Sequence, residues 1–300
     1  MLKIAYSSLY NHPVAEGHRF PMIKYDLIAE QLVYEGLVHA DNFFESESVE
    51  EKWIVATHHP EYWKKLNTLS LSPAEQRRSG FELTELLVHR ERCIVGGTIM
   101  AAQYALEYGV ALNIAGGTHH AYADKAEGFC LLNDNAVAAN YLLRNKLARR
   151  VLIVDLDVHQ GNGTAHIFRQ VNEVFTFSMH CAANIFSRKE KSDLDIELPA
   201  GLEDDAYLQM LRERLYQVIR FFRPDFVFYQ SGVDVLATDK LGKLSLSRNG
   251  CMERDRIVFE LCSVFRIPVA VDMGGGYSER LSDIVEAHCN TFRMAEKICL

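Results

Sequence analysis

The stretch over residues 150–163 constrains the fold most, because it runs from a buried strand directly into side chains that can bind a metal. Four apolar residues at 151–154 are typical of a strand that is buried on both faces of a parallel sheet. Asp155, Asp157 and His159 follow at alternating positions. Because strand side chains alternate between faces, these three would point the same way if the extended conformation continued.

A divalent metal explains this cluster best, because carboxylates and an imidazole are costly to bury unless their charge is compensated. Aspartate and histidine ligands suit zinc, and they also suit ferrous iron. A plainer alternative is a strand end at which an aspartate caps a helix and the histidine is exposed to solvent.

Composition narrows the class of protein. A chain of 300 residues with 48% apolar residues can bury a large core, and we predict a single catalytic domain over residues 1–300. A net charge of −8 argues against a nucleic-acid partner. Seven cysteines without a C-x-x-C pattern indicate reduced thiols and a cytoplasmic location. No long apolar run predicts a membrane span, and we expect a monomer by default.

Apolar runs that alternate with helical patterns predict a parallel sheet of an α/β protein. The expected strands are 3–6, 110–115, 151–155, 174–179, 225–230 and 267–272. The expected helices are 22–36, 91–108, 134–145, 204–222, 254–265 and 278–298.

The region over residues 40–87 is less regular than the rest. Ser72 and Glu75 match a capping box, which predicts that a helix begins there. We interpret His58 and His59 as residues of a loop or of the rim of the site.

Every unusual polar or glycine-rich cluster follows a predicted strand, and parallel sheets bind ligands at the carboxyl ends of their strands. These clusters are residues 116–121, 155–159, 231–234 and 272–277. Four clusters in such positions predict one active site at this edge of the sheet.

The residue types in these clusters are those of a metal-dependent hydrolase. Asp157, His159 and Asp234 can supply three metal ligands and leave a position open for water and substrate. The adjacent His119 and His120 can act beside that water as general base and general acid.

Three further residues complete the predicted machinery. Asp155 and Asn162 are candidates to orient the two histidines, and the aspartate would raise the pKa of its partner more than the neutral amide would. Tyr277, which follows three glycines, can donate its hydroxyl to a developing oxyanion. Nucleotide binding has little support, because no phosphate-loop pattern is present.

Together these motifs resemble the zinc-dependent histone deacetylase family. The resemblance runs from about residue 18 to residue 293 and is most similar to the class IV branch and its bacterial relatives. The segments that carry it are Gly-Gly-Thr-His119-His120, Gly128-Phe129-Cys130, Asp155-Leu-Asp157-Val-His159-Gln-Gly-Asn162-Gly, Ser231-Gly-Val-Asp234 and Gly-Gly-Gly-Tyr277.

The resemblance implies the arginase–deacetylase fold, in which helices flank a central, mostly parallel sheet in three layers. It implies hydrolysis of an N-epsilon-acyl-lysine amide in a protein or peptide, with Asp157, His159 and Asp234 as zinc ligands. It pairs His119 with Asp155 and places His120 near Asn162, with His120 as the general base. Many family members carry aspartate where this chain has Asn162.

The resemblance also implies a narrow substrate tunnel and a second ion. Phe129 and Gly128 would form one wall of the tunnel, and Leu241 would lie at its rim. The loop over residues 181–195, which would supply the opposite wall, does not follow the pattern of larger deacetylases. Arg19 would line the pocket beneath the metal. A structural potassium ion would be held by Asp155, Asp157, His159, Ser178 and Met179.

Three other functions remain open on the sequence. The same hydrolase could act on a small acylated amine such as an acetylated polyamine. A binuclear manganese ureohydrolase needs extra carboxylates, but Gly161 and Leu236 stand where they are expected. A protein that binds acyl-lysine without turnover would need to be inactive for a reason that the sequence hides. Nothing in the sequence sets the length of the acyl chain.

Overall fold

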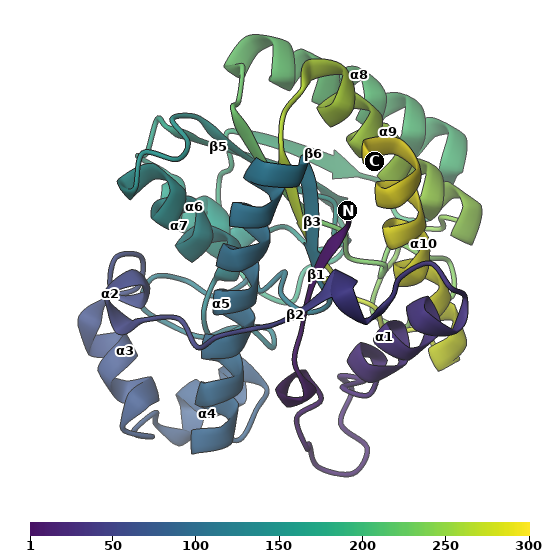
Figure 1. The fold of residues 1–300 in the computed structure, drawn as a ribbon. Coiled ribbons are helices and arrows are strands. Elements are labelled where there is room, and N and C mark those ends of the chain that lie inside the picture. The colour runs from purple at the N-terminus through teal and green to yellow at the C-terminus, as the bar shows by residue number, and fades with distance from the viewer.

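The computed structural model describes all 300 residues, and one sheet of eight strands forms its centre (Figure 1). The strands are β1 (Lys3–Tyr6), β2 (Phe43–Glu45), β3 (Val110–Asn113), β4 (Val151–Asp155), β5 (Val174–Cys181), β6 (Leu194–Leu198), β7 (Phe226–Gln230) and β8 (Val269–Asp272). They lie in the order β2-β1-β3-β8-β7-β4-β5-β6. Every neighbouring pair is parallel.

Helices cover both faces of the sheet, which gives the predicted three-layer α/β architecture (Figure 1). One face carries α5 (Glu85–Tyr108), α6 (Asp134–Arg144) and α7 (Asn162–Phe168). The other carries α1 (Lys24–Tyr34), α8 (Asp204–Phe222), α9 (Arg248–Phe265) and α10 (Leu281–Cys299). The short helices α2 (Glu51–Ile54), α3 (Pro60–Asn67) and α4 (Pro73–Ser79) pack outside the first group. No helix is both long and apolar enough to cross a membrane.

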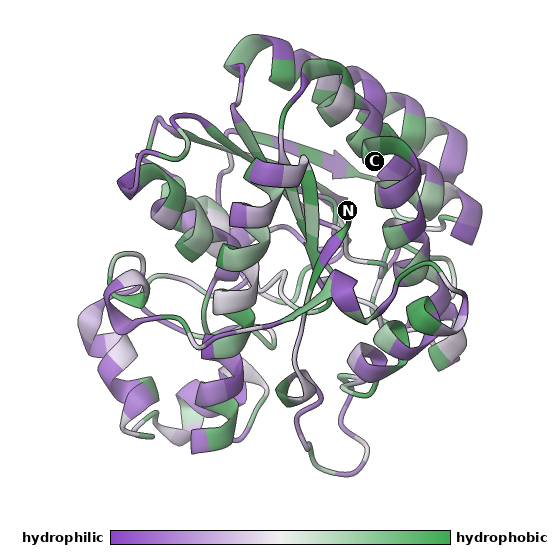
Figure 2. Ribbon diagram, viewed as in Figure 1, coloured by the Kyte–Doolittle hydropathy of each residue, from purple (hydrophilic) through white to green (hydrophobic).

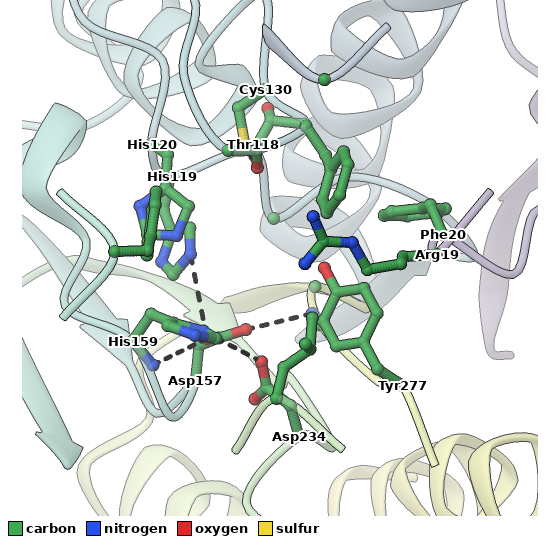
Figure 3. Close-up of a pocket in the computed structure, with 18 of the residues that line it drawn as sticks. Arg19, Phe20, Thr118, His119, His120, Cys130, Asp157, His159, Asp234 and Tyr277 are labelled. Atoms are coloured by element: carbon green, nitrogen blue, oxygen red, sulfur yellow. Dashed lines mark hydrogen bonds and ion pairs between the residues drawn. The ribbon is translucent and has the colours of Figure 1, made fainter. Parts of the chain in front are cut away.

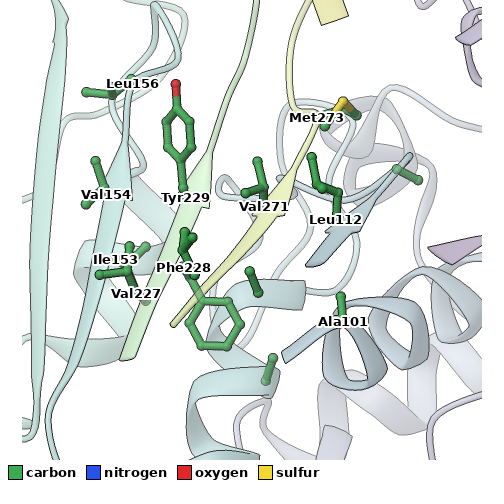
Figure 4. Close-up of a cluster of buried hydrophobic side chains, with 14 of the residues drawn as sticks. Ala101, Leu112, Ile153, Val154, Leu156, Val227, Phe228, Tyr229, Val271 and Met273 are labelled. Carbon is green, nitrogen blue, oxygen red and sulfur yellow. The ribbon is translucent and has the colours of Figure 1, made fainter. Parts of the chain in front are cut away.

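The apolar side chains of the strands form the core between these layers. Figure 2 shows hydrophobic residues along the central strands and hydrophilic residues on the outer sides of the helices. Figure 4 shows Val154, Tyr229 and Val271 on three neighbouring strands, and all three are at most 1% exposed. Full burial of one such aliphatic side chain contributes about 1.5–3 kcal/mol to folding.

The sequence predicted six of these eight strands and missed the two at the edges of the sheet. β2 has only three residues, and β6 alternates apolar and acidic residues. Edge strands pair on one side only, so they need no continuous apolar run. Four of the predicted strands also have different bounds in the structure. β3 ends at Asn113, β5 continues to Cys181, β7 begins at Phe226 and β8 begins at Val269.

Capping residues explain where the helices differ from expectation. α5 begins at Glu85 instead of 91, because the Thr84 side chain accepts a hydrogen bond from the Leu87 N–H. Likewise α9 begins at Arg248 instead of 254, where the Ser247 hydroxyl accepts from the Gly250 N–H. The capping box at the start of α4 is confirmed.

The strand order explains why four separate clusters can form one site. Strands β3, β8, β7 and β4 are consecutive neighbours, so the loops at their carboxyl ends meet. One sequence expectation was wrong in detail. β4 ends at Asp155, so the loop that follows, and not strand alternation, places Asp157 and His159.

Candidate functional site

Asp157, His159 and Asp234 converge at the carboxyl ends of β4 and β7 (Figure 3). Their candidate ligand atoms all lie within 4.8 Å of one another. Nδ1 of His159 lies 3.1 Å from Oδ1 of Asp157 and 3.3 Å from Oδ2 of Asp234. The three residues that the sequence nominated as metal ligands therefore share one small buried space.

The chemistry of this space fits a divalent cation. Oδ2 of Asp234 is buried and accepts no hydrogen bond, although it faces the imidazole of His159. Burial and the charge of Asp157 raise the pKa of Asp234 to about 7. Two carboxylates this close need positive charge between them, and a divalent cation bound here would supply it. This is the single cluster of three or more such residues that could hold an ion, which favours one metal per chain over a binuclear site.

Two glycines leave room for the carboxylates of the triad. The Gly275 N–H donates to Oδ2 of Asp157 at 3.0 Å, and Nε2 of Gln230 donates to the same oxygen at 3.1 Å. A Cβ on Gly275 would lie 2.1 Å from Oδ2 of Asp234, and a Cβ on Gly232 would lie 2.3 Å from Oδ2 of Asp157. Any side chain at either position would push into the triad.

The paired histidines have different partners. Nδ1 of His119 lies 2.6 Å from Oδ2 of Asp155. Nδ1 of His120 lies 2.7 Å from Oδ1 of Asn162, which also accepts a hydrogen bond from the Gly163 N–H. Because that amide oxygen can only accept, His120 carries its proton on Nδ1 and leaves Nε2 with a free lone pair.

These partners move the pKa values of the two histidines in opposite directions. Burial lowers the pKa of His119, but the charges of Asp155 and Asp157 outweigh it and raise the pKa to about 9. Burial, together with the charges of His119 and His159, holds the pKa of His120 well below its ordinary value. One cavity thus contains an imidazole that is readily protonated beside one that stays neutral, which suits acid–base chemistry.

The backbone of Tyr277 is held by Asp239, a residue that the sequence analysis did not single out. The Tyr277 N–H donates to Oδ2 of Asp239 at 2.6 Å. Oδ1 of Asp239 accepts from the N–H groups of Leu241 and Gly242, each at 2.8 Å. Burial and the charges of Asp234 and Asp157 raise the pKa of the Tyr277 hydroxyl well above its ordinary value, so it remains a hydrogen-bond donor.

The triad, the two histidines and Tyr277 line one cavity of about 390 Å³, and aromatic rings form part of its walls. The Phe129 ring lies 6.2 Å from the Tyr277 ring. The opposite wall is Phe186, whose ring centroid lies 4.5 Å from that of His120 and 5.4 Å from that of His159. The loop over 181–195, which the sequence could not interpret, therefore supplies this wall. A Cβ on Gly128 would lie 2.8 Å from the His120 ring.

Two more residues that the sequence nominated belong to the cavity lining. Leu241 and Arg19 both line the cavity, and Figure 3 shows the guanidinium of Arg19 directed toward the Tyr277 side chain. Asn184 was missed, although its amide donates to the Leu241 carbonyl oxygen at 2.6 Å and accepts from the Lys243 N–H at 2.9 Å. It joins the two loops that face Phe129.

His58 lies in the loop between α2 and α3, which was one of its two interpretations, but it is buried and does not lie at the rim of the site. It is 1% exposed, and it lies between the carbonyl of Tyr122 and the N–H of Asn133. A hydrogen-bonded histidine in a fold interior leaves no periodic signal in the sequence, so nothing there could have shown this.

The potassium site stays a prediction. Asp155 and Ser178 are register partners on β4 and β5, so the five nominated residues lie near one another at the end of this strand pair. No contact among these residues identifies a second ion.

Comparisons with known proteins agree with this geometry. The family model described as histone deacetylase domain matches residues 18–292. An uncharacterized protein of Picosynechococcus sp. is 43% identical over 295 residues, which cover 98% of this chain and 98% of the relative. Histone deacetylase 2 of Arabidopsis thaliana is 30% identical over 299 residues, with 95% of this chain and 76% of the relative covered.

Solved structures show the same fold. An HDAC homolog from Aquifex aeolicus has a TM-score of 0.83 at 24% identity, over 98% of this chain and 83% of that chain. The HD domain of HDA15 has a TM-score of 0.80 at 23% identity, over 97% of this chain and 90% of that chain. At these identities the likeness speaks for the fold alone.

Proposed function

Because the chain belongs to the histone deacetylase family, we propose that it is a metal-dependent hydrolase that cleaves the amide of an N-epsilon-acylated lysine in a protein or peptide. The observation that carries the proposal is a single cavity lined by a candidate ligand triad, two adjacent histidines and a tyrosine. These are the groups that hydrolysis of an unactivated amide requires.

Asp157, His159 and Asp234 would hold a divalent ion, with zinc and ferrous iron both compatible with this ligand set. When bound, the ion would polarise the amide carbonyl and lower the pKa of a water molecule. Phe129 and Phe186 would direct the lysine stem toward the triad and exclude bulk water from it.

The chain's own residues would move the protons. His120 would accept the proton of the attacking water on Nε2 as the bond from oxygen to the carbonyl carbon forms. The hydroxyl of Tyr277 would donate a hydrogen bond to the oxygen that becomes negative. His120 would then return its proton to the lysine nitrogen as the carbon–nitrogen bond breaks, while Asp155 keeps His119 protonated beside it.

The test is turnover of lysine peptides that carry acetyl, octanoyl or myristoyl groups, measured with added zinc. We expect Tyr277→Phe and Asp234→Asn to lower kcat by about 100-fold or more. The matched control is Tyr216→Phe, because Tyr216 lies on α8 and is 46% exposed. Wild-type turnover in both site variants would refute the proposal, as would no turnover by the wild type on any peptide. The preferred acyl length would report the depth of the pocket.

A further inference from the structure

Besides Arg19, three exposed basic side chains line the cavity, although the molecule as a whole is acidic. Arg77, Arg78 and Lys243 line the cavity and are exposed to solvent. The chain carries a net charge of −8. A positive mouth on a negative protein therefore distinguishes this region from the rest of the surface.

The two arginines are held beside the Phe129 wall. The Arg78 carbonyl oxygen accepts from the Gly128 N–H at 3.2 Å, and the Ser79 carbonyl oxygen accepts from the Phe129 N–H at 2.9 Å. These bonds fix the end of α4 to the tunnel wall. Arg77 and Arg78 thus stand where the parts of a substrate outside the tunnel would pass.

Lys243 is held on the facing side. Its N–H donates to Oδ1 of Asn184 at 2.9 Å, and its Nζ donates to the Ala183 carbonyl oxygen at 3.0 Å. Ala183 and Asn184 begin the loop that carries Phe186, so this ammonium lies next to the second wall. Positive charge therefore flanks the opening on two sides.

No carboxylate of the protein neutralises this charge. The only acidic residues that line the cavity are Asp157 and Asp234, and both belong to the metal triad. Acidic groups close to these segments are engaged elsewhere, because Glu75 pairs with Lys65 and Glu197 pairs with Lys189. The three basic residues are therefore free to pair with the carboxylates of a bound molecule.

We propose that the preferred substrate is an acyl-lysine flanked by aspartate or glutamate, and that cationic acylated polyamines are disfavoured. This proposal rests on the deacylase function proposed above. A positive mouth raises the local concentration of anionic segments and repels cations. An acetylated polyamine keeps at least one ammonium group, whereas acidic flanks would meet Arg77 and Arg78 on one side and Lys243 on the other.

The test measures kcat/KM for three peptides and for acetylputrescine. Each peptide carries one acyl-lysine, and the peptides differ only in whether its flanking residues are glutamate, glutamine or lysine. We expect the glutamate peptide to exceed the lysine peptide by about tenfold at low salt, and this ratio to shrink at high salt. In the double variant Arg77→Glu with Arg78→Glu, the ratio should fall to about one or reverse. Because the ratio is taken within one variant, a general loss of activity cancels.

The control is the double variant Arg214→Glu with Arg220→Glu. Both arginines are exposed on α8, which contributes no residue to the cavity, and the net charge changes by the same amount. This variant should keep the wild-type ratio. Equal kcat/KM for all three peptides, or acetylputrescine as the best substrate, would overturn the acidic-flank proposal while hydrolysis itself stands. No turnover of any peptide would instead overturn the deacylase function on which it rests.

Discussion

At the scale of single residues, His58 shows how one buried imidazole secures the loop that carries a tunnel wall. Its Nδ1 lies 2.9 Å from the Tyr122 carbonyl oxygen, and its Nε2 accepts from the Asn133 N–H at 3.0 Å. Gly128 and Phe129 lie between these two anchor points. Only the neutral ring can donate from one nitrogen and accept at the other, so protonation would break the second bond.

His58 therefore predicts a loss of stability in acid. Burial, partly offset by the bond to Tyr122, lowers the pKa of His58 from its ordinary value of 6.5 to about 4. Below pH 6.5 the unfolded chain binds the proton more readily, so the free energy of unfolding falls as pH drops toward 4. Above pH 6.5, His58 adds no pH dependence to the free energy of unfolding.

The measurement is the free energy of unfolding by denaturant between pH 7 and pH 4. His58→Gln should flatten the slope by up to about 1.4 kcal/mol per pH unit, while His39→Gln, at an exposed histidine, should leave it unchanged. A residual slope is expected, because burial also lowers the pKa of His180 to about 4. Identical slopes in wild type and His58→Gln would contradict the assignment.

At the scale of elements, a side chain of α9 joins the two loops that carry the candidate metal ligands. The Arg254 guanidinium is fully buried and donates to the carbonyl oxygens of Ser231 at 3.1 Å, Gly232 at 2.5 Å and Leu156 at 3.3 Å. It also pairs with the buried carboxylate of Asp255 at 2.8 Å. One planar group thereby joins the loop after β4 to the loop after β7.

Removing the Arg254 guanidinium should lower the stability of the protein. We expect Arg254→Met to lower the free energy of unfolding by about 3–5 kcal/mol, because Asp255 would stay buried without its partner. Arg254→Lys should recover only part of this loss, since an ammonium cannot match the fork. The control is Arg256→Lys on the same helix, whose partly exposed pairs with Glu253 and Glu260 contribute about 1 kcal/mol or less. Equal losses at both positions would show that Arg254 has no special role.

At the scale of the whole molecule, the parallel sheet brings together groups that lie far apart along the chain, and a bound metal should stabilise that arrangement. Asp157 and Asp234 follow strands that are direct neighbours. A ligand that binds only the folded state adds about 2.7 kcal/mol at a concentration 100 times its Kd. We expect Tm to rise with added zinc or ferrous iron and to fall with a chelator.

The control compares a substitution inside the triad with one outside it. Asp234→Asn should abolish the zinc-dependent rise in Tm, whereas Asp225→Asn, at an exposed residue just before β7, should keep it. A chelator that leaves the wild-type Tm unchanged after prolonged dialysis would argue against a resident metal at this site.

The same scale shows what the sequence could and could not predict. The order of the central strands and of the six long helices was readable, as were the residues of the triad, because buried runs and ligand-type residues leave local patterns. The short helices α2, α3 and α7 were not among the expected helices. The edge strands β2 and β6 were not, since partial burial leaves a weak pattern. Phe186, Asn184 and Asp239 were also missed as parts of the site. Their contacts join loops that are distant in the sequence, and no spacing rule encodes such contacts.

The close approach of Gly232 and Gly275 to the triad carboxylates also bears on how this site can change during evolution. Every missense change at a glycine codon adds at least a Cβ, and here that atom would occupy the space of the carboxylate oxygens. Neither position therefore has a conservative replacement. We therefore expect active variants to keep glycine at both positions and to change specificity through other residues that line the cavity.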